Sequence, residues 1–228
     1  MKRLVAAVAA TFALVAGCSS GGHDSVQASN TTDPTTSPSP KANYTAPPAS
    51  LPVPGSTVSL TTSPPPWAPP AVINNGALSG AYVAAAGLPY SEEMLQVHYH
   101  AHLDINVNGK AVEVPPYLGW VAKGNNAIGL SPLHTHDSSG IIHIENSVPA
   151  DFLLGQVFVE WGVKFTPTCL AGYCAGNGNE LAVFVNGQRY AGDPTRLVLK
   201  KHQEIAIDYG PSGKVPTPPA SYKFPNGL

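Results

Sequence analysis

The sequence predicts an α+β domain, made mostly of antiparallel β-sheet with one short helix and preceded by a disordered tether. Three observations predict it. Apolar and polar residues alternate strictly over residues 96–107, two Asn-Gly pairs each separate short apolar segments, and the first third of the chain is rich in Pro, Ser and Thr. Alternation with a period of two is typical of a half-buried strand, and an Asn-Gly pair is typical of a tight hairpin turn.

The chain begins with a basic Met1-Lys2-Arg3 segment, and an apolar run follows from Leu4 to Ala16. This run is shorter than the ~20 residues that a membrane-spanning helix needs, so residues 1–17 are predicted to be a signal peptide. The end of this run and the two residues after it, Val15-Ala16-Gly17-Cys18, resemble the lipobox of bacterial lipoproteins. That resemblance implies that Cys18 carries acyl chains such as palmitate, which hold the chain on the extracytoplasmic face of the cell membrane. A soluble secreted protein, cut at an Ala-x-Ala-like site, is the alternative.

Residues 18–70 are expected to form the tether, because 12 of the 24 prolines lie between Pro34 and Pro70. Such a segment cannot bury enough apolar surface to offset the entropy of ordering it. Residues 71–90 are expected to be a transitional arm, with a helical turn or packed segment among its small apolar residues. Residues 91–228 then have the length of one ordinary domain, and Ser91-Glu92-Glu93 is predicted to begin a helix.

The alternation places Val97, Tyr99 and the apolar residues that follow on one face of a strand, and His98, His100, His102, Asp104 and Asn106 on the other. Asn108-Gly109 then predicts a hairpin with residues 111–114, and the second hairpin is predicted around Asn186-Gly187. Further strands are predicted at 140–145 and 204–209. Asp151 is expected to cap the one short helix, over 151–161. The order of hairpin, helix and hairpin is similar to that of β-grasp folds, an analogy that carries no function.

The remaining two cysteines, Cys169 and Cys174, frame a four-residue loop. In a chain that leaves the cytoplasm this spacing predicts a local disulfide bond, with a soft metal site as the alternative. The formal net charge is −2 and only 11% of residues are charged, so the chain has no basic field to bind nucleic acid. Attachment to the membrane is expected to come from the lipid anchor.

Six of the eight histidines fall within the 46 residues from 98 to 143, and they are predicted to ligate metal: His98, His100, His102, His134, His136 and His143. Imidazole is the commonest metal-ligating side chain, and same-face residues two apart on a strand lie ~6.6–6.8 Å apart, which two rings can bridge. Residues four apart lie ~13 Å apart, so the first three should not all bind one ion. Two of them are expected to join His134 and His136, with His143 as an alternative.

Three carboxylates accompany these histidines: Asp104, Asp137 and Glu145. They are expected to orient the imidazoles through hydrogen bonds to ring N–H groups, or to add an oxygen ligand. The isolated residues His23 and His202 are expected to be ordinary surface histidines. Copper or zinc is the expected metal, since nitrogen-rich sites suit both ions and copper(II) leads the affinity order.

Three motifs occur in order along the domain: His98-x-His100-x-His102-Leu-Asp-x-x-Val-Asn-Gly, Leu133-His134-Thr-His136-Asp137-x-x-Gly-Ile-Ile-His143-Ile-Glu145, and Gly155-Gln156-x-Phe158-x-x-Trp161-Gly162. Together they resemble a family of uncharacterised secreted or membrane-anchored prokaryotic proteins, of actinobacterial type. The resemblance covers residues 90–210. It implies that the histidines act as a unit, and it brings no activity.

Three functions are compatible with these features. The first is a lipid-anchored protein that binds copper or zinc for buffering, resistance or delivery, favoured because the chain has no nucleophile motif, no His-Glu-x-x-His and no phosphate-binding glycine loop. The second is a metalloenzyme in which three histidines hold the ion and a bound water is activated, with Glu145 or Asp137 as general base. The third is a cell-envelope interaction module whose histidines sense acid near pH 6–7. The sequence identifies no protein partner.

Overall fold

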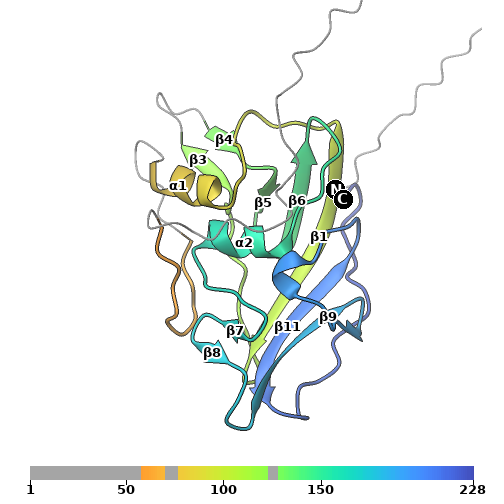
Figure 1. Ribbon diagram of the computed structural model, residues 1–228. Helices are drawn as coiled ribbons and strands as arrows, with labels where there is room; N and C mark the ends of the chain where they lie inside the picture. The colour runs from red at the N-terminus through yellow and green to blue at the C-terminus, as the bar shows by residue number, and fades with distance from the viewer. Residues whose placement is uncertain (1–57, 70–76, 123–127) are drawn as a thin grey trace, which may run out of the picture. The chain divides into compact units, whose positions relative to one another are not determined.

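The computed structural model describes residues 58–69, 77–122 and 128–228 (Figure 1). The predicted signal peptide, the lipidation site Cys18 and most of the predicted tether lie outside these residues. Among the residues described, no helix is both long enough and apolar enough to cross a membrane.

The described residues form a seven-stranded mixed sheet with the order β10-β9-β11-β1-β6-β5, to which β2 is added by pairing with β1. The strands of this sheet are β1 (Val97–Val107), β2 (Lys110–Ala111), β5 (Leu133–His134), β6 (Ile141–Asn146), β9 (Asn179–Val185), β10 (Gln188–Arg189) and β11 (Glu204–Pro211). Two small two-stranded sheets pair β3 (Trp120–Ala122) with β4 (Ile128–Leu130), and β7 (Cys169–Leu170) with β8 (Tyr173–Cys174). The predicted class, mostly antiparallel β-structure with few helices, is confirmed.

Both predicted Asn-Gly hairpins are present. Asn108 and Asn186 adopt positive φ angles of 53° and 50°, and the glycine after each is also in the positive-φ region. This is the conformation that a two-residue hairpin turn requires and that Asn and Gly tolerate best. The turns join β1 to β2 and β9 to β10.

One pairing in the sheet is parallel, and the sequence pattern does not predict it. β11 lies beside β1 with His102 opposite Glu204 and Val107 opposite Tyr209, so the last strand of the domain fills the centre of the sheet. β6 pairs with the other edge of β1 in antiparallel register. β1 therefore has a partner strand along its whole length, β6 from Val97 to His102 and β11 from His102 to Val107, which fixes the position of its histidines.

Two helices, α1 (Ala77–Ala85) and α2 (Leu154–Trp161), contribute to the core on one face of the sheet (Figure 1). The core also contains the apolar side of β1, including Leu103 and Ile105. The amide of Gln156 joins the two helices, because its oxygen accepts a hydrogen bond from the backbone N–H of Leu153 and its nitrogen donates to the carbonyl of Ala86. The opposite face of the sheet is left for the polar residues of β1.

Two predictions about helix ends are wrong. Asp151 is exposed and lies two residues before the N-cap, Leu153, so Gln156 caps the helix in its place. Residues 91–96 form no helix, because Ser91 pairs through its backbone with Leu130.

The described residues also contain two helical segments besides α2. α1, in the expected arm, is a full helix rather than a single turn, and Pro194–Arg196 form a short 3-10 helix, η2.

The folded domain begins earlier than the sequence suggests. Trp67, in the segment assigned to the tether, is only 4% exposed and packs edge-on against Trp161, with ring centroids 5.7 Å apart. The indole N–H of Trp161 donates to the carbonyl of Trp67, and Thr61 pairs with Val163. The proline-rich composition therefore gave no sign that this segment packs on the domain through Trp67.

The predicted disulfide bond between Cys169 and Cys174 is confirmed, and it closes the β7–β8 hairpin.

Candidate metal centre

The strand register brings three histidines into a row across three neighbouring strands. His100 of β1 lies opposite His143 of β6, which in turn lies opposite His134 of β5. Adjacent strands are ~4.8 Å apart and side chains directly opposite each other point to the same face, so the three rings are neighbours. The row explains why segments over thirty residues apart in the sequence meet.

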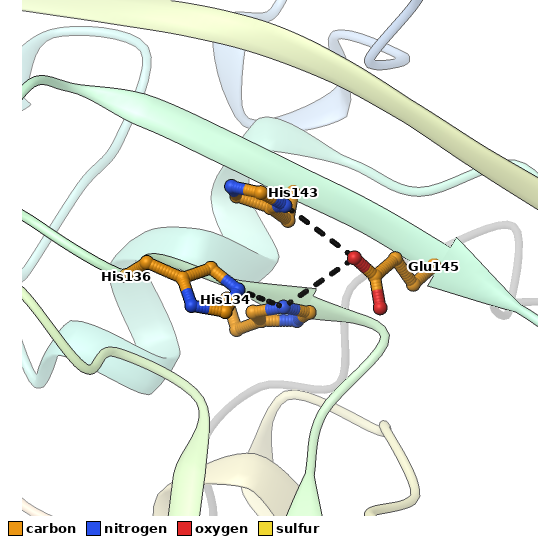
Figure 2. Close-up of side chains that lie close together, drawn as sticks. All are labelled: His134, His136, His143 and Glu145. Atoms are coloured by element: carbon orange, nitrogen blue, oxygen red, sulfur yellow. Dashed lines mark hydrogen bonds and ion pairs between the residues drawn. The ribbon is translucent and has the colours of Figure 1, made fainter. Parts of the chain in front are cut away.

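Three more donors flank this row. His98 lies opposite Glu145 in the β1–β6 pairing, two residues along from the row on the same face. His136 follows β5 and turns its ring toward His134 and His143, with ring centroids 5.0 and 4.4 Å away. Figure 2 shows His134, His136, His143 and Glu145 directed toward a common point. We refer to the six residues as the histidine cluster: His98, His100, His134, His136, His143 and Glu145.

The distances within the histidine cluster are those of ligands around a metal ion. The Nε2 atoms of His98 and His100 are 3.0 Å apart, and those of His134 and His136 are 3.2 Å apart. His143 Nδ1 lies 3.2 Å from His100 Nε2 and 3.4 Å from Glu145 Oε1. Ligands bound at ~2.0–2.1 Å in a tetrahedral zinc site are ~3.3 Å from each other. The side chains are thus already spaced for coordination.

The backbone sets the tautomer of His134. Its Nδ1 donates a hydrogen bond to the carbonyl of Ser131 over 3.0 Å, so in the neutral ring the lone pair is on Nε2, which faces the histidine cluster. A hydrogen bond from the non-ligating nitrogen to a carbonyl is the usual support of a metal-bound histidine. Burial lowers the pKa of His134 to about 4, so the ring is neutral at pH 7 and its lone pair is available.

The neighbouring imidazoles are held neutral in the same way. Burial is the largest cause that lowers the pKa of His100 to about 4, and the neighbouring His143 and His98 also lower it. Burial and His143 also lower the pKa of His136. Protons therefore compete weakly for these nitrogens at neutral pH, which favours metal binding.

Glu145 is a ligand candidate in its own right and not only a partner of ring N–H groups. Oε1 lies 3.3 Å from His98 Nε2 and 3.8 Å from His134 Nε2, and the side chain is only 3% exposed. Burial alone would raise its pKa, but the hydrogen bond to His143 and the charges of the surrounding histidines outweigh burial and lower it. Oε2 is buried and has no hydrogen-bond partner among the described residues. A buried carboxylate oxygen without a partner is costly, and a bound cation would satisfy it.

His102 lies apart from the other five histidines, in agreement with the expectation that the three histidines of β1 do not share one ion. Its Nδ1 is 2.9 Å from Glu204 Oε2, and its Nε2 donates to the carbonyl of Ser139 over 2.8 Å. Its ring stacks on Tyr222 with centroids 3.6 Å apart. Burial opposes protonation, but the hydrogen bond and charge of Glu204 raise the pKa of His102 above its ordinary value.

The other two predicted carboxylates do not enter the histidine cluster. Asp104 is exposed and groups with His102 and Glu204, whose candidate ligand atoms lie within 4.8 Å of one another. Asp137 is exposed as well, and its Oδ1 accepts a hydrogen bond from the backbone N–H of Ser139. Asp137 therefore stabilises the turn after His136, and its charge acts on His136 from outside.

Sequence reasoning missed several neighbours of the histidine cluster. Trp120 packs edge-on against His136 with centroids 5.5 Å apart, and the exposed Tyr117 packs against Trp120. Behind His134, the hydroxyl of Ser131 donates to the buried carboxyl of Glu160. Trp120 precedes a segment without clear alternation, and Glu160 lies in an apolar helix, so neither carried a signal that linked it to the histidines.

Comparison of the chain with protein-family models, with curated protein sequences and with solved structures finds no match. The class of site therefore rests on its own geometry. The residues that the structure describes contain histidine groups that could hold a metal ion.

Proposed function

We propose that this protein is a lipid-anchored, extracytoplasmic protein whose domain binds copper or zinc through the histidine cluster, for buffering, resistance or delivery of the metal. The observation that carries the metal-binding part is the convergence of five imidazoles and one carboxylate, with donor atoms 3.0–3.8 Å apart. Packing alone gives no reason for so many imidazole nitrogens to face one another.

The donor set favours borderline transition metals over magnesium or calcium. Imidazole nitrogen suits zinc and copper, whereas the hard cations prefer sites built from oxygen alone. Two acidic residues also act on the exposed side of the cluster, since the charges of Glu93 and Asp137 raise the pKa of His136 and favour a cation there. These charges support capture of a positively charged ion.

Metal content tests this proposal. The full chain is purified without a histidine tag, loaded with zinc(II) or copper(II), freed of excess metal and measured by mass spectrometry. We expect at least one tightly held ion per chain, and a loss of at least one equivalent in the His134→Ala, His136→Ala double variant. His202→Asn is the matched control, because His202 lies outside the cluster and Asn tolerates its φ of 56°. Near-zero metal in the wild-type chain after loading would overturn the proposal.

A metalloenzyme is the second candidate, and the exposure of the site favours it. The side chain of His98 is 35% exposed and His136 is exposed as well, so one side of the cluster is open to solvent. An open side leaves room for a bound water, which catalytic zinc sites keep and closed structural sites lack. Spectroscopic detection of an exchangeable water on the bound ion separates the enzyme from the carrier.

The anchor has its own test, independent of metal. Cys18→Ala removes the thiol of the lipobox-like segment, and we expect the variant protein to leave the membrane fraction and to lose incorporation of labelled palmitate. Retention of both properties in the variant would exclude Cys18 as the lipidation site and leave the metal proposal untouched.

A further inference from the structure

The donor atoms of the histidine cluster fall into two groups that have His143 in common. One contains His134, His136, His143 and Glu145, and the other contains His98, His100 and His143, each with its ligand atoms within 4.8 Å of one another. The six donors also exceed the four that a tetrahedral ion takes.

Each group is built around the same unit. His98 with His100, and His134 with His136, are pairs two residues apart whose Nε2 atoms lie 3.0 and 3.2 Å from each other. In each pair one ring is buried, that of His100 or His134, and the other reaches the surface. Each pair therefore has a fixed inner nitrogen and its own opening to solvent, which are the requirements for binding an ion independently.

We propose that the histidine cluster holds two transition-metal ions, one at each His-x-His pair, with Glu145 between them. This inference rests on the proposed metal-binding function and adds the second ion. Oε1 of Glu145 faces both pairs, at 3.3 Å from His98 Nε2 and 3.8 Å from His134 Nε2. Its buried Oε2, which has no partner among the residues described, gives the carboxylate a second oxygen for a second ion. Metal pairs held in this way are typically ~3.5–4 Å apart.

The two ions differ in affinity. The pair His134 and His136 has the stronger support, because the carbonyl of Ser131 fixes the His134 tautomer. His98 is the exposed member of the other pair. Among the described residues its ring contacts His100 and Glu145 but makes no hydrogen bond to a backbone carbonyl. The first ion also repels the second, although the charge of Glu145 reduces the repulsion. We expect the ion at His98 and His100 to bind at least about tenfold more weakly.

Stoichiometry of zinc(II) binding to the full chain, measured by calorimetry and by equilibrium dialysis, tests the inference. We expect two ions in the wild type and in His202→Asn, one in the His98→Ala, His100→Ala variant, and one in the His134→Ala, His136→Ala variant. Because loss of the buried His100 can disturb folding, His98→Gln at the rim is measured as well. It should weaken only the second ion, with near-ultraviolet circular dichroism unchanged.

The outcomes are distinguishable from failure of the proposed function. No ion in the wild type overturns both, whereas one ion in the wild type leaves metal binding standing and overturns the second site. Two ions that persist in both His98 variants would place the second ion elsewhere and overturn this assignment. Copper(II) gives a further readout, because two ions this close couple magnetically. The paramagnetic signal should rise with the first equivalent and fall with the second, and a signal that rises linearly to two equivalents contradicts the proposal.

Discussion

The carboxyl of Glu160 accepts a hydrogen bond from the hydroxyl of Ser131 over 2.5 Å, inside the domain behind His134. Burial raises the pKa of Glu160 to about 8, against an ordinary value of 4.5. The group is therefore protonated in the folded protein at neutral pH.

This raised pKa makes stability depend on pH. The contribution of the protonated Glu160 is fully present below the unfolded pKa of 4.5 and is lost as the pH rises through about 8. Gln at position 160 cannot ionise, so the Glu160→Gln variant should not lose this stability. Between pH 5 and pH 8 its free energy of unfolding should therefore rise relative to that of the wild type by roughly a few kcal/mol. Urea unfolding at several pH values measures this, with the surface variant Glu92→Gln as control. A difference between Glu160→Gln and wild type that stays constant with pH would contradict the prediction.

Acid should destabilise the metal-free domain through His134 and His100. Both folded pKa values are lowered from 6.5 to about 4, so the unfolded chain takes up these protons first as the pH falls. Stability is full above about pH 6.5 and declines toward pH 4, by on the order of 2 kcal/mol at pH 5 for His134 alone. Unfolding in the presence of a chelator, at pH 7.5 and pH 5, measures the decline. His134→Gln should show a smaller one, and an equal decline in the variant would argue against His134 as a cause.

Copper(II) should quench the fluorescence of Trp120. The Trp120 ring lies 5.5 Å from that of His136, so an ion on His136 is within contact range of the indole, whereas Trp67 and Trp161 pack against each other in the core. A titration should give saturable quenching with copper(II) and little with zinc(II), whose filled d shell offers no quenching states. Trp120→Phe should lose most of this quenching. Equal quenching in that variant would place the copper elsewhere.

Gly119 is predicted to be essential to the shape of the centre. It has a φ of 72°, and an added Cβ would lie 2.2 Å from the carbonyl oxygen of Leu133 and 3.0 Å from the Cβ of His134. Gly109 is a matched control, with a φ of 76° and no atom within 4 Å of the corresponding position. Gly109→Ala should cost about 1–2 kcal/mol from backbone conformation alone. Gly119→Ala should cost clearly more and weaken metal binding, as measured by unfolding and calorimetry, and similar losses in both would remove the steric argument.

Local sequence patterns predicted the fold correctly where the local preference agreed with the tertiary contacts. The alternation from Val97 to Val107 predicted the strand and its two faces, and Asn108 and Asn186 predicted the hairpins. The same rules failed where a distant contact decided the structure. Ser91 pairs with Leu130 instead of beginning a helix, and Trp67 is held by Trp161 despite its proline-rich surroundings.

The candidate site shows the same division. Spacing alone predicted that the three histidines of β1 do not all bind one ion and that two of them join His134 and His136. Which of the three stands apart was not predicted, and the structure shows that it is His102. That His143 lies between the pairs depends on the register of β6 with both β1 and β5, which no sequence period encodes. The pairing of His102 with Glu204 depends on a parallel contact between strands a hundred residues apart, so Glu204 could not be recognised as a neighbour.

The central position of β11 also constrains when the domain can form. Strands β1 and β9 are both made before Glu204–Pro211, yet each needs β11 to cover one of its edges. Until residues 204–211 have been synthesised, those two edges stay open and able to pair with strands of other molecules. Contacts this far apart in sequence also form slowly. The sheet, with the candidate metal centre on β1, β5 and β6, is therefore complete only after the C-terminal strand β11 has been synthesised.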